Sequence, residues 1–203
     1  MVDMTRYGMV IDLERCIGCN ACTIACKAAH WTPPGVFWGR VLEKEIGTYP
    51  SVSRIFLPVL CNHCSDALCV SVCPTGASYR REDGLVLINY NRCIGCRACM
   101  QACPYGARFF VQDDRGYLDG AAPGPHELQE SASLRGVVTK CDYCAGRMDE
   151  GLDPACVEVC PASARYFGDL NDPNSEVARL ISKNRGFQLR PEKGTHPSVF
   201  YIG

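Results

Sequence analysis

The chain has 203 residues, a formal net charge of −1 and 16 cysteines. The near-neutral charge excludes the broad basic face that nucleic-acid binding requires. The longest apolar runs are a few residues, far short of the roughly 20 that cross a bilayer, so no membrane-spanning helix is expected.

The first predicted element is a short strand over Tyr7–Asp12, because Met9, Val10 and Ile11 form an apolar run. Residues 32–49 contain Pro-Pro-Gly and a charged run, which predicts an insertion. We expect the aromatic residues in and just before this segment to cover a cluster or a small core. Contact with a partner protein is the alternative. These aromatic residues are Trp31, Phe37 and Trp38. The strand over Tyr7–Asp12 leads directly into the first of four cysteine groups, which is Cys16, Cys19, Cys22 and Cys26.

Residues 54–60 predict a second strand, interrupted by Pro58. A third strand is predicted over residues 85–88, after the turn signal Glu-Asp-Gly at 82–84. Between these two strands lies the second cysteine group, Cys61, Cys64, Cys69 and Cys73.

Residues 92–104 read R-C-I-G-C-R-A-C-M-Q-A-C-P, which is the bacterial ferredoxin pattern C-x2-C-x2-C-x3-C-P. Three thiolates on one tight loop can hold three irons of a [4Fe–4S] cluster, and in two-cluster ferredoxins the fourth cysteine ligates the other cluster. Gly95 and Ala98 are small enough for close approach of the backbone. Zinc is the alternative, but it favours paired cysteine knuckles that close on one ion. This third group is Cys93, Cys96, Cys99 and Cys103.

Residues 108–111 predict a return strand, and residues 112–136, rich in Gly, Pro and Asp, predict a surface loop or arm that could grip a partner. Asp172-Pro173 predicts a helix start that continues to about Asn184, with Asp172 as N-cap. Residues 187–203 predict an extended tail, either frayed or laid on another subunit. Residues 137–140 lead into the fourth group, Cys141, Cys144, Cys156 and Cys160.

The chain contains an internal repeat. Residues 15–26 and 92–103 agree at nine of twelve positions, and residues 69–79 and 156–166 agree at seven of eleven. Repeated supersecondary units are best explained by stacking. We therefore expect an α+β fold of two ferredoxin-like modules of the bacterial dicluster type, related by approximate two-fold symmetry. Short strands and helices would pack around four cubane clusters, so cluster binding and folding would be coupled.

With all four groups in view, the chain resembles the four-cluster iron–sulfur subunits of the dimethyl sulfoxide reductase (molybdopterin oxidoreductase) family. The most similar types are those of polysulfide, thiosulfate, tetrathionate and arsenate reductases and of phenylacetyl-CoA:acceptor oxidoreductase. Beyond the cysteines, the resemblance includes A-C-P-Y-G-A-R-F-F at 102–110, D-P-A-C-V-E-V-C-P at 153–161 and G-D-L-N-D-P-N-S at 168–175.

The resemblance implies cysteine groups paired from the outside in, first with fourth and second with third. Cluster 1 would take Cys16, Cys19, Cys22 and Cys160, and cluster 2 would take Cys26, Cys141, Cys144 and Cys156. Cluster 3 would take Cys61, Cys64, Cys69 and Cys103, and cluster 4 would take Cys73, Cys93, Cys96 and Cys99. The outer module would comprise residues 1–53 and 137–168, and the inner module residues 54–111. Residues 112–136 would form a loop or arm, and residues 169–203 a C-terminal helix and docking tail.

The resemblance also implies a non-catalytic electron-transfer subunit of an anaerobic respiratory complex, with four [4Fe–4S] clusters. Single electrons would pass between a molybdopterin (Mo or W) catalytic subunit, nearest cluster 1, and a membrane-anchor, quinone-reactive subunit, nearest cluster 4. The alternatives are an iron–sulfur subunit of a formate dehydrogenase or hydrogenase complex, a free-standing polyferredoxin and a zinc-stabilised interaction module. Residues 1–8 carry no apolar h-region and no twin arginine, so we expect peripheral attachment, or export, through a partner.

Several residues near the cysteines have two interpretations. His63 lies inside C-N-H-C, but Cys61, Cys64 and Cys69 already form a trio, so packing or hydrogen bonding is expected rather than ligation. We expect a positive charge near a cluster to raise the reduction potential of that cluster. The alternative is that the positively charged residues are ordinary solvated charges or contact another subunit. The candidates are Lys27, Arg97 and Arg108. We identify no catalytic set and no direct small-molecule substrate site.

Overall fold

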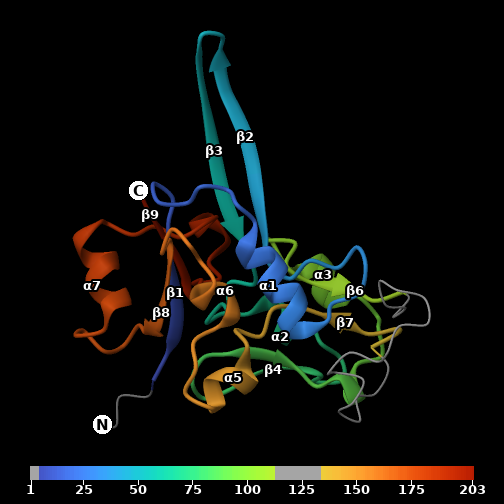
Figure 1. Ribbon diagram of the computed structural model, residues 1–203. Coiled ribbons are helices and arrows are strands. Elements are labelled where there is room, and N and C mark those ends of the chain that lie inside the picture. Colours follow the sequence, from blue (N-terminus) through green and yellow to red (C-terminus); the bar gives the residue numbers. More distant parts are fainter. Residues whose placement is uncertain (1–4, 113–133) are drawn as a thin grey trace.

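The computed structural model describes residues 5–112 and 134–203, in which short helices and strands are mixed (Figure 1). The helices are α1 (Ala21–His30), α2 (Leu68–Ser71), α3 (Ala98–Ala102), α5 (Ala145–Asp149), α6 (Ala155–Glu158) and α7 (Glu176–Lys183). The strands are β1 (Tyr7–Asp12), β2 (Arg40–Thr48), β3 (Ser51–Val59), β4 (Ser78–Arg80), β5 (Val86–Ile88), β6 (Phe109–Phe110), β7 (Val138–Thr139), β8 (Arg165–Asp169) and β9 (Val199–Ile202). Two 3-10 turns are η1 (Tyr90–Arg92) and η2 (Pro191–Lys193). Within these two ranges, every helix is too short or too polar to cross a membrane.

Strand β1, which the sequence predicted with its observed bounds, is the middle strand of a three-stranded sheet. It pairs antiparallel with β8 and parallel with β9. Because successive side chains of a strand alternate between faces, Val10 points to α7 while Met9 and Ile11 point into the main core. Burial on both faces explains why this strand reads as a continuous apolar run.

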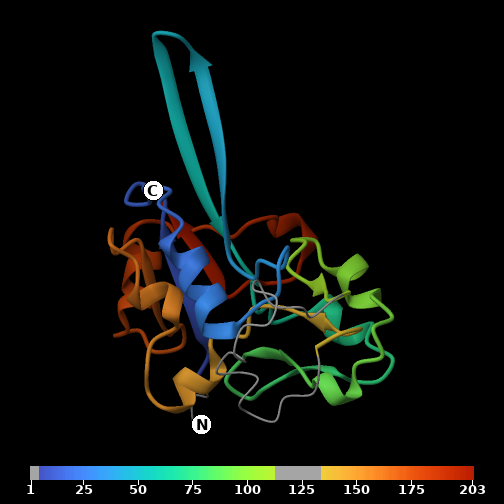
Figure 2. The ribbon, with the colours of Figure 1, turned by 45° about the vertical axis from the view of Figure 1, so that its right-hand side comes forward.

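Strands β2 and β3 form a two-stranded hairpin that projects far from the rest of the molecule (Figures 1 and 2). The pairing runs from Arg40 opposite Val59 to Thr48 opposite Ser51. The strand predicted over residues 54–60 is therefore the second half of this hairpin. Half of the predicted insertion over residues 32–49 is strand β2, the first strand of this hairpin.

Two further strand pairs lie beside the second, third and fourth cysteine groups. Strand β4 pairs with β5, and β6 pairs with β7 through Phe109 opposite Thr139 and Phe110 opposite Val138. The predicted strands at 85–88 and 108–111 are both present in a slightly shorter form, and strand β7 forms within residues 137–140, which lead into the fourth cysteine group. The β6–β7 pair brings the end of the third cysteine group next to the start of the fourth.

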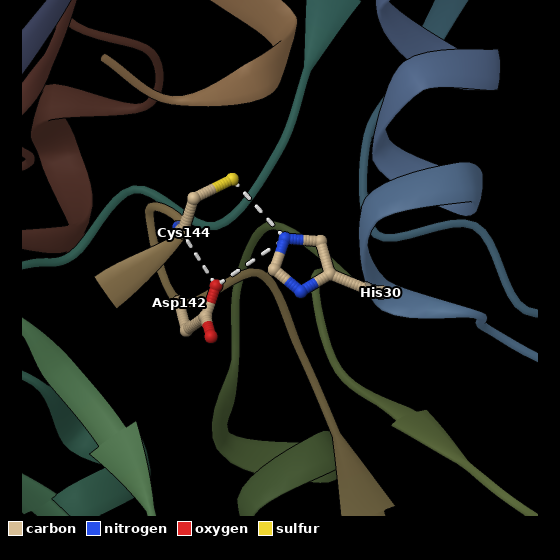
Figure 3. A group of neighbouring side chains, drawn as sticks. All are labelled: His30, Asp142 and Cys144. Atoms are coloured by element: carbon tan, nitrogen blue, oxygen red, sulfur yellow. Dashed lines mark hydrogen bonds and ion pairs between the residues drawn. The ribbon is translucent and has the colours of Figure 1, made fainter. Parts of the chain in front are cut away.

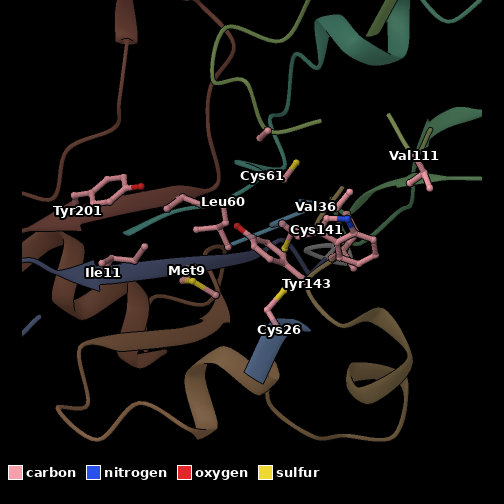
Figure 4. Packing of buried hydrophobic residues seen from close by; sticks show 14 residues of the cluster. Met9, Ile11, Cys26, Val36, Leu60, Cys61, Val111, Cys141, Tyr143 and Tyr201 are labelled. Carbon is pink, nitrogen blue, oxygen red and sulfur yellow. The ribbon is translucent and has the colours of Figure 1, made fainter. Parts of the chain in front are cut away.

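The main core lies where the three-stranded sheet meets the cysteine loops (Figure 4). Met9 and Ile11 come from β1, and Tyr201 from β9 donates its hydroxyl proton to the Pro58 carbonyl oxygen at 2.9 Å. Three thiols belong to the same buried set, Cys26, Cys61 and Cys141. Cysteines of three different groups thus lie in the hydrophobic core rather than on its rim.

The C-terminal helix begins later than the sequence predicted. Helix α7 spans Glu176–Lys183, and its N-cap is Ser175, whose hydroxyl accepts from the Ala178 N–H at 3.1 Å. Asp172, the predicted N-cap, instead accepts from the Asn174 N–H at 2.8 Å and closes the preceding turn. Both residues can cap a helix, and the serine is the one followed by uninterrupted helical backbone.

Residues 187–203, expected as an extended tail that is frayed or laid on another subunit, end in a strand of the chain's own sheet. Strand β9 completes the chain's own sheet, and Val199, Tyr201 and Ile202 are buried. Of the aromatic residues expected to form a roof, Trp38 is buried and donates its indole N–H to Thr139 Oγ1 at 3.0 Å, whereas Trp31 and Phe37 are exposed. Most of the predicted loop at 112–136 lies outside the described residues.

Candidate iron–sulfur sites

The first and third cysteine groups have the same loop conformation. In each, a glycine with positive φ, Gly18 at 69° and Gly95 at 66°, follows the first cysteine by two residues. A left-handed residue then starts the helix, Asn20 before α1 and Arg97 before α3. A Cβ atom on Gly18 would lie 2.2 Å from the Phe56 ring, so glycine is required for space as well as for conformation. The sequence repeat is therefore a repeat of backbone geometry.

One cavity joins the third group to the second. Its walls include Ile88 and Val138, and its empty volume is about 320 Å³. The thiol-bearing residues that line it are Cys93, Cys96, Cys99 and Cys73. Helix α3 of the third group contacts α2 of the second group, which brings these segments together.

A second cavity, with about 340 Å³ of empty volume, joins the first group to the fourth. Val41 and Pro58, at the base of the hairpin, form part of its wall, and Arg165 forms another part. Its thiol-bearing residues are Cys16, Cys19, Cys22 and Cys160. Helix α1 of the first group contacts α6 of the fourth.

The remaining eight thiols form two more neighbourhoods. Burial, reinforced by the thiols of Cys156 and Cys144, raises the pKa of Cys26 to about 12. Burial, reinforced by Cys61 among its neighbours, raises the pKa of Cys64 to about 12. The first neighbourhood contains Cys26, Cys141, Cys144 and Cys156. The second contains Cys61, Cys64, Cys69 and Cys103.

These neighbourhoods have a chemistry that suits iron. All sixteen cysteines lie in the described part of the chain, and none forms a disulfide. Buried thiols close to one another resist ionisation, because each thiolate would be desolvated and repelled by the next. Metal cations reverse this preference by pairing with the thiolates, so four convergent thiols form a donor set for a cationic centre.

Two unpaired polar atoms also fit a bound cluster. The Nε of Arg108 and the hydroxyl of Tyr143 are buried and have no hydrogen-bond partner among the described residues. Both groups lie among thiols, Arg108 beside Cys69 and Tyr143 near Cys141 and Cys61. Buried donors are almost always paired, so the missing acceptors are consistent with the sulfides of a [4Fe–4S] cluster.

The cysteines that precede Pro74 and Pro161 receive backbone hydrogen bonds. The Ser78 N–H donates to Cys73 Sγ at 3.4 Å, and the Ala164 N–H donates to Cys160 Sγ at 3.3 Å. Burial raises the pKa of Cys73, but hydrogen bonds from Ser78 and neighbouring groups outweigh it and bring the pKa down to about 7. Such N–H donors stabilise thiolates and raise the potential of an attached cluster.

His30, Asp142 and Cys144 form a compact group at the edge of one thiol set (Figure 3). His30 Nε2 lies 3.1 Å from Cys144 Sγ and 3.7 Å from a carboxylate oxygen of Asp142. The same carboxylate accepts from the Cys144 N–H at 2.8 Å. Because Cys144 already belongs to a set of four thiols, His30 and Asp142 orient this cysteine, and a separate metal site need not be invoked.

His63 stacks on Tyr143 with ring centroids 3.8 Å apart and an interplanar angle of 16°. Its Nδ1 accepts from the Val86 N–H at 3.1 Å, so Nε2 carries the proton and donates to the Cys141 carbonyl oxygen at 3.0 Å. Burial, together with Lys140, holds the pKa of His63 well below its ordinary value. The expectation that His63 packs and hydrogen-bonds is confirmed.

The candidate charges have different environments. The Lys27 ammonium donates to the carbonyl oxygens of Thr32, Pro33 and Val36, so it holds a loop. The Arg97 guanidinium lies 3.7 Å from the centroid of the Phe110 ring. Arg108 does contact thiols, and Arg165, which the sequence analysis did not identify, does so as well.

Family models match most of the chain. A model described as a 4Fe-4S dicluster domain matches residues 52–119 and again residues 119–170. A model described as a 4Fe-4S binding domain matches residues 7–28. These matches include cysteines of all four groups.

Relatives that align with nearly all of this chain include subunits of reductases. The arsenate respiratory reductase iron–sulfur subunit of Shewanella sp. strain ANA-3 is 43% identical, over 97% of this chain and 96% of the relative. A Halobacterium salinarum protein named as a dimethyl sulfoxide reductase iron–sulfur subunit is 46% identical, over 98% and 79%. A tetrathionate reductase subunit of Salmonella typhimurium is 43% identical, over 98% and 72%.

Proposed function

Because this chain belongs to the four-cluster iron–sulfur electron-transfer subunits of the dimethyl sulfoxide reductase family, we propose that it connects a molybdopterin-containing catalytic subunit to a quinone-reactive membrane subunit. When bound, [4Fe–4S] clusters supply one-electron redox chemistry. The protein's part is to hold the thiolates, exclude water and tune potentials. The relatives favour this function over a formate dehydrogenase or hydrogenase subunit and over a free-standing polyferredoxin.

The observation that carries the proposal is the convergence of thiols from distant parts of the chain on two matched cavities. Each cavity takes three cysteines from one loop and a fourth from a partner loop. This is the arrangement that two-cluster ferredoxins use. A zinc module would need only one local set of four thiols for each ion.

We assign the ligands on this basis. The first cavity would hold cluster 4 on Cys93, Cys96, Cys99 and Cys73, and the second would hold cluster 1 on Cys16, Cys19, Cys22 and Cys160. Cluster 2 is assigned to Cys26, Cys141, Cys144 and Cys156, and cluster 3 to Cys61, Cys64, Cys69 and Cys103. The contacts of α1 with α6 and of α2 with α3 support pairing of the first group with the fourth and the second with the third.

The same contacts support two α+β ferredoxin-like modules with approximate two-fold symmetry. The outer module would comprise residues 1–53 and 137–168, and the inner module residues 54–111. His63 and Tyr143, each one residue before the second cysteine of its group, stack on one another where the two modules would meet. Contact between equivalent residues is typical of a pseudo-two-fold axis.

Partners and location follow from the relatives' names and the family resemblance. The relatives are subunits of respiratory reductases, so a catalytic partner is proposed for this chain. The proposed membrane partner would place the chain at a membrane surface, peripherally, through subunit contacts. Cluster 1 would be nearest the catalytic subunit and cluster 4 nearest the membrane partner.

The proposal predicts the cofactor content. Four irons and four sulfides for each of four clusters give about sixteen of each per chain. Iron and acid-labile sulfide assays on anaerobically purified complex measure both numbers. About twelve irons, or a three-iron EPR signal in undamaged oxidised protein, would contradict four complete clusters. A colourless protein that contains zinc would contradict the function itself.

A further inference from the structure

Two arginines are buried among thiols. Arg165 and Arg108 are only 5% and 3% exposed. Within the described residues, no carboxylate lies within ion-pair distance of either guanidinium. By contrast, the surface arginines Arg54, Arg81 and Arg147 all pair with carboxylates. A buried charge without a counter-ion is costly, so the arginines must face other negative groups.

Arg165 faces thiols from two different sets, which would be thiolates with iron bound. One Nη donates to Cys22 Sγ at 3.4 Å, and the other lies 3.9 Å from Cys156 Sγ. Cys22 belongs to the set assigned to cluster 1, and Cys156 to the set assigned to cluster 2. A single guanidinium thus spans the two sets of the outer module, with Met9 Sδ 3.5 Å away as its other described contact.

Arg108 has the same position in the inner module. Its guanidinium donates to Cys69 Sγ at 2.9 Å, and the Cys99 thiol is also among its neighbours. Cys69 belongs to the set assigned to cluster 3, and Cys99 to the set assigned to cluster 4. Burial lowers the pKa of Arg108, but the thiols of Cys69, Cys61 and Cys99 outweigh it and raise the pKa above its ordinary value.

The two arginines do not come from equivalent positions of the repeat. In the alignment of residues 69–79 with 156–166, the residue that corresponds to Arg165 is Ser78. Ser78 Oγ accepts a hydrogen bond from Arg108 at 2.8 Å. Each module therefore has one guanidinium in this place, although in the inner module it comes from the segment after the third cysteine group. The retention of the charge, despite its different origin, indicates that the charge itself is needed.

We propose that the positive charges of Arg165 and Arg108 raise the reduction potentials of both clusters in their own module. Reduction adds a negative charge to a cluster, and a nearby cation stabilises that state, so it raises the potential. Arginine suits this place because its rigid fork can donate to two acceptors at once and remains charged when buried. Lys140 is a further buried cation, but its ammonium donates to the Cys141 carbonyl oxygen at 2.6 Å.

The test compares Arg165→Gln, Arg108→Gln, the double variant and Arg54→Gln in the purified complex. Glutamine keeps hydrogen-bonding capacity and removes the charge. Reduction potentials are measured by redox titration followed by EPR. In Arg165→Gln, two of the four potentials should fall, each by about tenfold in the one-electron equilibrium constant, or about 59 mV. In Arg108→Gln the other two should fall, and in the double variant all four should fall. Arg54→Gln, on the exposed hairpin, should match the wild type.

Arg165→Lys and Arg108→Lys separate charge from shape. Lysine keeps the charge but lacks the fork, so the same two potentials should fall by less than in the glutamine variant. If a glutamine variant fails to bind iron, the lysine variant at the same position is used instead. The proposal then requires that only two of the four reduction potentials change. The proposal would be overturned if the reduction potentials did not change, or if the Arg165 and Arg108 variants lowered the same two potentials. It would also be overturned if a lysine variant lowered the potentials as much as the glutamine variant does.

The inference depends on the proposed ligand sets, and the two can fail separately. A wild-type complex with fewer than four one-electron transitions would refute the cluster content. A wild-type complex with four transitions, and arginine variants that retain sixteen irons without any shift, would refute the role of the arginines alone.

Discussion

His63 and Tyr143 occupy corresponding positions in the second and fourth cysteine groups, and they contact each other. Both precede the second cysteine of their group, and their rings stack at 3.8 Å in the centre of the molecule. Figure 4 shows Tyr143 among Cys26 and Cys141, which belong to one thiol set, and Cys61, which belongs to another. The stacked pair fills the volume between the sets with flat, rigid rings, which excludes water from the space that electrons must cross.

The assignment of Cys26 can be tested by counting iron in single and double variants. Cys26→Ala and Cys19→Ala should each remove one cluster, about four irons, because each cluster needs all its thiolates. If the two cysteines serve different clusters, the double variant should lose about eight irons. Cys26→Ala combined with Cys144→Ala should lose only about four, because those two are assigned to the same cluster.

Cys103→Ala is the matched control, because Cys103 occupies the corresponding place in the repeat. Combined with Cys96→Ala it should also lose about eight irons. A Cys26–Cys19 double variant that loses no more iron than either single variant would show that the first group holds its own cluster with four local ligands.

The cysteines could be predicted as ligands from their spacing alone, because three thiolates would have to converge from one short loop. Of the two arginines proposed to tune the clusters, Arg108 could be named as a candidate from the sequence, but Arg165 could not. Arg165 lies nine residues after Cys156 and looks like any charged residue in a strand, and only the fold reveals that it also reaches Cys22, 143 residues away in the sequence. His30 is similar, since its contact with Cys144 spans 114 residues.

At the scale of the elements, strand β9 shows how the C-terminal segment joins the core. It pairs with β1, and Val199 and Tyr201 extend the face of β1 that carries Met9 and Ile11. The strand is therefore part of the core that supports the first cysteine group, which follows β1 directly.

Tyr201→Phe should lower the stability of the complex-free, cluster-loaded chain. The variant removes the hydroxyl that donates to the buried Pro58 carbonyl, which costs about 1–3 kcal/mol. Thermal unfolding followed by cluster absorbance measures the effect. Tyr79→Phe, on the exposed face of β4, is the matched control and should leave the midpoint unchanged. Equal midpoints for both variants would show that the β9 contact contributes nothing.

The elements beside cysteines were predictable because the strand and the loop that it delivers are adjacent in the sequence. The hairpin was not, since Leu42 and Ile46 alternate with Glu43 and Glu45 in a segment whose charges suggested a loop. The register of the hairpin places Leu42, Ile46 and Ile55 on one face together with Lys44, and places Glu43, Glu45 and Arg54 on the other face. Strand β9 was missed because its partner lies about 190 residues earlier in the chain.

At the scale of the whole molecule, the order of the clusters between the two partner subunits is testable. Cys96→Ser changes a ligand of cluster 4, proposed to be nearest the membrane partner, so quinone-coupled turnover should fall sharply. Turnover with a redox dye that meets the catalytic subunit directly should survive. Cys19→Ser, at cluster 1, should also break quinone coupling and should impair dye turnover and subunit docking more.

The comparison requires assembled complexes, so iron content and subunit stoichiometry are measured first, because cluster binding and folding are coupled. If the Cys96 variant assembles yet loses dye turnover while the Cys19 variant keeps it, the proposed order of the clusters is reversed. The order itself came from family resemblance, because the cysteine spacing is symmetric and carries no direction.

The nesting of one half of the chain inside the other has a consequence for biosynthesis. Strand β1 pairs with β8, and α1 contacts α6, so the first segment to be synthesised folds against segments that begin at Ala155. The segments between them pair locally, with α2 against α3. During translation, the thiols assigned to the inner pair of clusters are all available once Cys103 has left the ribosome. On the proposed ligand assignment, the first group would wait with its cysteines exposed until Cys160 follows, so it would be the part of the nascent chain most in need of protection from oxygen and stray metals.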